Sequence, residues 1–104
     1  MIGVLIAVLL GSPAPACKGS PKLQAKAKVD CASARKTALA KLGGGPGLRV
    51  KSAELEEEGG KLVYSFDIAR KGKPGVDEVQ VDAVTGEVAS VKHETAAAEA
   101  KEKD

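Results

Sequence analysis

The stretch Val79–Val88, with sequence VQVDAVTGEV, constrains the fold more than any other part of this chain. Its first residues alternate between apolar and polar side chains, which is the period of a strand with one buried face. Gly86 can adopt a positive φ without steric cost, while Asp82 and Thr85 carry short polar side chains that bond to loop amides. The stretch therefore predicts a β-hairpin whose turn is built by Asp82, Thr85 and Gly86.

A helix and further strands are predicted to precede this hairpin. Residues 30–42 are rich in alanine and have an apolar stripe, with Asp30 as N-cap and glycines directly after them. Residues 48–57 change parity near Lys51-Ser52, which predicts a strand with a bulge. Residues 61–70 alternate strictly, so one set of side chains should face the helix. The pattern predicts an α+β fold, with one N-terminal helix packed on a small antiparallel sheet of three to four strands.

Residues 1–16 are predicted to form an export signal. The apolar run from Met1 to Leu10 is far shorter than the roughly 20 residues that span a bilayer. It is followed by Ala14-x-Ala16, whose small side chains suit the pockets of a signal peptidase. No Lys or Arg precedes the apolar run, so the positive charge would come either from a start upstream of Met1 or from the α-amino group alone. We expect the mature protein in the periplasm, in the cell envelope or secreted.

Cleavage after Ala16 would leave Cys17 as the first mature residue, and two fates for its thiol exclude each other. In one, Cys17 pairs with Cys31 in an oxidising compartment, which two cysteines in a small exported domain favour. In the other, Cys17 is lipidated and anchors the protein, although Ala14 and Pro15 depart from the usual lipoprotein pattern. A plainer interpretation leaves Cys31 as a small buried helix residue.

The remaining organisation follows from charge. Residues 17–28 read as a Lys-rich linker, residues 29–93 as the domain, and residues 94–104 as a disordered Ala/Glu/Lys tail. Residues 30–93 hold ten basic and ten acidic side chains, and Tyr64 and Phe66 are the only aromatics in the chain. A nucleic-acid binder would show a basic stripe with interleaved aromatics, so that class is excluded. We expect a monomer that meets a membrane only through a lipid anchor.

No catalytic, metal or cofactor site is predicted. His93 is the only histidine, and the cysteines lie too far from it in the predicted fold to complete a zinc site. No Gly-x-Ser-x-Gly sequence is present for a nucleophilic serine. The glycine-rich residues 43–47 follow a helix and lack the Lys-Ser/Thr pair of a phosphate-binding loop.

Four segments together resemble the PepSY domain family over about residues 29–92. They are the alanine-rich helix ending at Gly43, AELE at 53–56, VYSFDI at 63–68 and EVQVDAVTGEV at 78–88. The resemblance implies a helix on an antiparallel sheet, an exported or membrane-associated protein, and a role in inhibiting or modulating peptidases. The family has no established catalytic residues to carry over. No protease domain follows within these residues, so we expect any inhibition to act in trans.

Two functional hypotheses remain. The first is a non-catalytic binding module that modulates a protein partner, such as a peptidase. It would use an exposed sheet edge, or the small-residue face around Val63, Ser65 and Ala69. The alternative is a passive envelope accessory or structural lipoprotein without a dedicated protein target.

Overall fold

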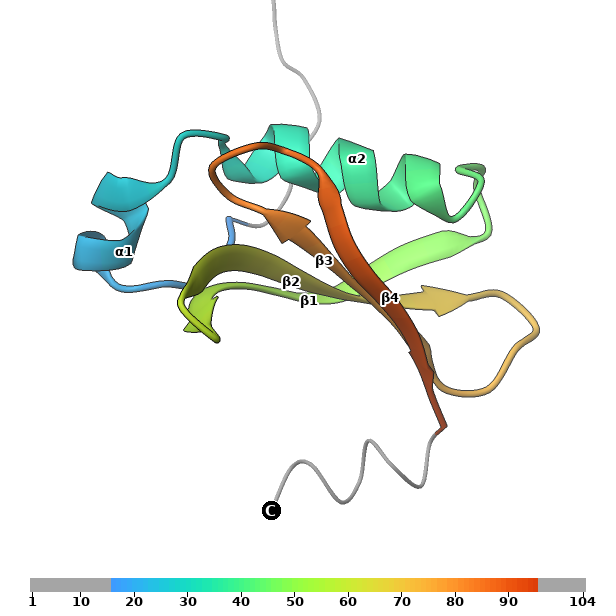
Figure 1. Ribbon diagram of the computed structural model, residues 1–104. Coiled ribbons are helices and arrows are strands. Elements are labelled where there is room, and N and C mark those ends of the chain that lie inside the picture. The colour runs from blue at the N-terminus through green and yellow to red at the C-terminus, as the bar shows by residue number, and fades with distance from the viewer. Residues whose placement is uncertain (1–15, 96–104) are drawn as a thin grey trace, which may run out of the picture.

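A computed structural model describes residues 16–95 of the 104-residue chain. The elements in chain order are α1 (Pro21–Lys26), α2 (Cys31–Lys41), β1 (Leu48–Glu58), β2 (Lys61–Arg70), β3 (Val76–Asp82) and β4 (Val88–Glu94). The four strands form one antiparallel sheet in the order β1-β2-β3-β4, and α2 lies across one of its faces (Figure 1). The predicted α+β architecture is confirmed. The predicted signal peptide, apart from Ala16, and the predicted tail beyond Thr95 lie outside the described residues.

Helix α2 begins and ends where the sequence predicts. The Asp30 carboxylate accepts a hydrogen bond of 2.7 Å from the amide of Ser33, which satisfies one of the unpaired donors of the first turn. Leu42 is the C-cap, and Gly43 follows with a φ of 95°. Ala34 and Ala38 have no exposed surface, and their small side chains let the helix lie close to the sheet.

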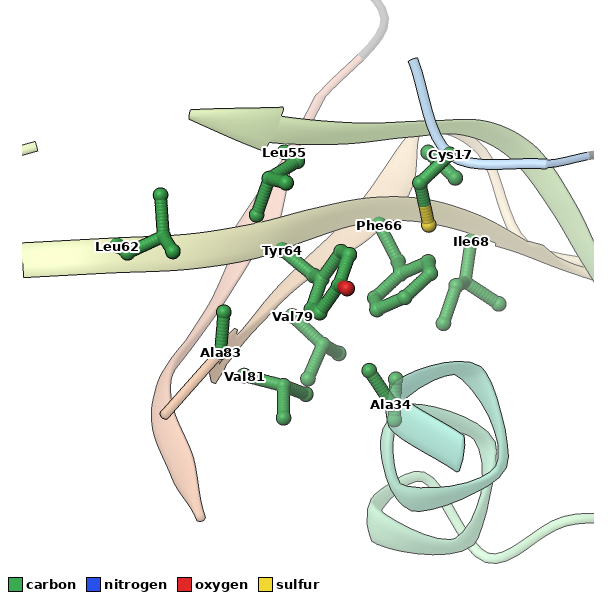
Figure 2. Packing of buried hydrophobic residues seen from close by; sticks show 12 residues of the cluster. Cys17, Ala34, Leu55, Leu62, Tyr64, Phe66, Ile68, Val79, Val81 and Ala83 are labelled. Carbon is green, nitrogen blue, oxygen red and sulfur yellow. The ribbon is translucent and has the colours of Figure 1, made fainter. Parts of the chain in front are cut away.

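The core lies between α2 and the sheet and is centred on β2. The side chains predicted to face the helix are all buried: Leu62, Tyr64, Phe66 and Ile68. Figure 2 shows Tyr64, Phe66 and Ile68 on the side of the sheet where Ala34 of α2 lies. The Tyr64 hydroxyl donates a 2.6 Å hydrogen bond to the carbonyl of Val29, so the aromatic ring is core and its polar end ties β2 to the chain before α2.

Two irregularities set the register of the sheet. The predicted bulge in β1 is present, between Val50 and Ser52. A second irregularity separates Gln80 from Val81 in the β3–β4 pair, where Val81 pairs with Val88 but Gln80 pairs with Ser90. Ala89 is the extra residue. Val88 and Val91 therefore both face the helix side although their positions have opposite parity.

Three boundaries differ from the prediction. The segment interpreted as a linker contains α1, which is capped by Ser20 and has no buried residue. Strand β1 extends one residue beyond its predicted end, to Glu58, and the turn that follows consists of Gly59 and Gly60. Glu94, assigned to the tail, is the last residue of β4 and is only 8% exposed. Among residues 16–95, no helix is long and apolar enough to cross a membrane.

Candidate functional site

The first outer strand, β1, is covered by the N-terminal segment. Cys17 and Cys31 form a disulfide with their Cα atoms 5.8 Å apart, and Cys17 is only 7% exposed. Next to it, Lys18 donates a backbone hydrogen bond of 2.9 Å to Ala53 and accepts one of 2.6 Å from Leu55. The predicted disulfide is confirmed, and it holds a short parallel bridge against the middle of β1. This part of the edge cannot accept an added strand.

The second outer strand, β4, pairs on one side only, with β3, among residues 16–95. Its bulge at Ala89 interrupts the regular ladder in the first half of the strand. The second half is regular and runs from Val91 to Glu94. Val91 is 43% exposed, so an apolar side chain is available on the open strand. Sequence reasoning named an exposed edge but not which strand provides it, because the cover over β1 comes from the tertiary fold.

The face of the sheet opposite α2 carries a chain of hydrogen bonds across all four strands. The Ser65 hydroxyl donates to Glu56 at 2.6 Å and accepts from the side-chain amide of Gln80 at 3.0 Å. The side-chain oxygen of Gln80 accepts a hydrogen bond from Ser90 at 3.1 Å. The side-chain amide nitrogen of Gln80 also donates to Glu58 at 2.7 Å. These hydrogen bonds satisfy the hydroxyl group of Ser65, which is a buried polar residue.

The candidate binding residues Val63, Ser65 and Ala69 lie on this same face of β2. Val63 is 3% exposed and Ser65 is 7% exposed, while Ala69 is half-buried near the end of the strand. The first two therefore offer little surface to a partner, and Ser65 already uses its hydroxyl within the sheet. Ala69 is the accessible member of the three, and it lies where β2 approaches the turn to β3.

The turn residues have the geometry expected of them. The Asp82 carboxylate accepts from the amides of Val84 at 2.8 Å and Thr85 at 2.9 Å, and Gly86 has a φ of 83°. The hydrogen bond from the backbone amide of Thr85 lowers the pKa of Asp82 below its usual 3.8, and the bond from the amide of Val84 makes the second-largest contribution. The Ala83 carbonyl accepts from the amides of Lys28 and Val29, so the turn holds the segment that leads into α2. The three predicted turn residues thus lie together and shape the backbone.

The only cluster with a histidine lies at the other end of the sheet. His93 Nδ1 is 2.8 Å from an Asp77 carboxylate oxygen, and the Arg70 guanidinium is 3.7 Å from the second oxygen. Arg70 also donates to the carbonyl of Leu42 at 3.2 Å, which joins the end of α2 to β2. Within the described part of the chain, no group of three or more His, Cys, Asp or Glu residues is placed to hold a metal ion.

The fold and these contacts define a class: a small α+β module with one main helix on a four-stranded antiparallel sheet, in which a disulfide-linked segment covers the middle of one sheet edge. The family model described as peptidase propeptide and YPEB domain matches residues 32–92, which is more than half of the chain. The chain belongs to this PepSY family, whose domains are generally non-catalytic modules of the propeptide or inhibitor type. No match was found among curated proteins or among solved structures.

Proposed function

We propose that this protein is an exported, non-catalytic PepSY module that binds a peptidase in trans and modulates or inhibits it. The observation that carries the proposal is the asymmetry of the two sheet edges. The Lys18 segment covers the middle of β1, whereas β4 pairs only with β3 among residues 16–95. An extended peptide that adds to a free edge gains main-chain hydrogen bonds, and side chains on alternate positions supply specificity.

Export is supported by the disulfide, because a small domain keeps such a bond in an oxidising compartment. The same bond uses the Cys17 thiol that lipidation would need, so the exported protein is proposed to be free of a lipid on this residue. The passive lipoprotein alternative depends on a lipid at Cys17, so the disulfide argues against it. A dedicated partner is favoured by Val91, since an exposed valine on an open strand gives an added strand an apolar contact.

The partner can be identified by crosslinking in the cells that produce the protein. A photo-reactive side chain replaces Lys92 on β4, and in the control it replaces Lys36 on the exposed side of α2. We expect reproducible capture of one peptidase from the Lys92 position and not from the Lys36 position, identified by mass spectrometry. Capture of the same abundant envelope proteins from both positions would contradict the proposal.

A further inference from the structure

Basic side chains gather at one end of this nearly neutral domain. The first end contains the C-terminus of α2, the loop that leads into β1, and the β2–β3 turn (Figure 1). The second end contains the β1–β2 turn and the β3–β4 loop. Residues 41–50 and 69–77 hold five basic side chains and one acidic side chain. Residues 54–61 and 82–87 hold six acidic side chains and one basic side chain, but the four lysines of residues 18–28 lie beside them, and Lys26 pairs with Glu57 at 3.3 Å. The first end is therefore strongly positive although the domain is not.

A cavity of about 400 Å³ lies at the positive end, between the loop that follows α2 and the β2–β3 turn. Four cationic side chains line it: Arg49, Arg70, Lys71 and Lys73. The amide of Lys71 donates a 2.8 Å hydrogen bond to the carbonyl of Gly47, so the two loops are joined across the cavity.

The four cations are not equivalent. Arg70 is held in place by the Leu42 carbonyl and by Asp77, and its side chain is 34% exposed. The side chains of Arg49, Lys71 and Lys73 are exposed and form no ion pair within the part of the chain that the structure describes. One fixed guanidinium and three unpaired cations around a concave surface suit a ligand with several negative oxygen atoms.

We propose that this cavity, which we term the basic cavity, binds an acidic peptide segment of a partner protein. Clusters of Arg and Lys recognise acidic motifs through charge-assisted hydrogen bonds. A membrane surface fits less well, because the exposed large hydrophobic side chains among residues 16–95 are Val84 and Val91, and neither lines the cavity. The site goes beyond the proposed function, since its test involves neither a peptidase nor the β4 edge.

The test uses the full chain with its disulfide formed, and hexaglutamate peptide as the probe in an NMR titration. We expect saturable shifts of the amide signals of Gly47, Arg49 and Lys71. Removing one exposed ion pair should weaken binding about threefold, so a triple variant in which Arg49, Lys71 and Lys73 are each changed to Gln should weaken it roughly thirtyfold. Raising the ionic strength from about 0.01 M to about 0.15 M should also weaken binding, because the Debye length falls from about 30 Å to about 8 Å.

The matched control changes Lys22, Lys36 and Lys61 to Gln, which removes the same charge from exposed positions outside the cavity. This variant should bind hexaglutamate within about twofold of the parent protein, since its lysines do not contact the peptide. An equal loss in both triple variants, or no saturable shift at the cavity, would overturn the proposal. Binding to phosphatidylglycerol vesicles without binding to the peptide would assign the positive end to a membrane and would also overturn it. Shifts that depend on protein concentration alone would assign the cavity to a second copy of this chain, which likewise contradicts a separate partner.

Discussion

Removing the disulfide gives the sharpest test of how this small domain is stabilised. The bond joins Cys17 to Cys31 at a sequence separation of 14, so the closed loop contains about 15 residues. In the chain-entropy treatment, opening a loop of this length costs about 3 kcal/mol of folding free energy. For a domain of roughly 60–100 residues, each kcal/mol shifts the melting temperature by about 4–8 °C. A variant with Cys17→Ala and Cys31→Ala should therefore melt about 12–24 °C lower.

The assay is thermal unfolding of the full chain followed by circular dichroism, with reduced parent protein as the control for the substitutions themselves. Both samples should show faster amide hydrogen exchange at Leu55, since its amide bonds to Lys18 only while the disulfide holds that segment in place. A double variant that melts within about 4 °C of the parent protein would correspond to a loss of 1 kcal/mol or less. That result would refute the claim that the disulfide stabilises the domain by closing this loop.

Three further predictions concern the turn and the core. Gly86→Val should destabilise the domain by more than about 1 kcal/mol, because the turn requires a φ of 83° there, and an unchanged urea midpoint would refute this. Tyr64→Phe should cost about 1–2 kcal/mol by the same measurement, because the carbonyl of Val29 loses its donor; equal stabilities would show that water replaces the hydroxyl. The folded-state pKa of Asp82 lies below 3.8. The ionised carboxylate therefore contributes fully to the free energy of unfolding above pH 3.8, and this contribution is lost as the pH falls through the folded-state pKa. The melting temperature of Asp82→Asn should therefore decline less than that of the parent protein on acidification, and parallel declines would contradict the role of the carboxylate.

Local patterns in the sequence were sufficient for much of the fold. The N-cap at Asp30, the strict alternation of β2 and the glycine at position 86 each depend on residues close in sequence, and all three agree with the structure. The bulge near Ser52 was predictable because one extra residue in a strand is the simplest way to change the parity of its buried side chains. These features follow from propensity, period and turn chemistry acting in agreement.

The structure differs from the prediction where contacts between residues distant in the sequence determine the conformation. Helix α1 has only six residues and none of them is buried, so its sequence has no apolar stripe that would predict a helix. The bulge at Ala89 depends on pairing between two strands, whereas the sequence of β4 alone shows only two valines of opposite parity. The same limit applies to the candidate site, because the segment that covers β1 and the side chains that gather at the basic cavity are brought together only by the tertiary fold.

The most direct test of the proposed function measures inhibition of the captured peptidase by the purified protein and two variants. Val91→Lys places a charge on the open strand, and Val84→Lys makes the same change in the β3–β4 loop, where valine is similarly exposed. Both changes should alter stability by no more than about 0.5 kcal/mol, since each side chain is exposed. The account predicts that Val91→Lys loses inhibition while Val84→Lys retains it. Equal inhibition by the two variants, or none by the parent protein, would contradict the claim that β4 binds the peptidase.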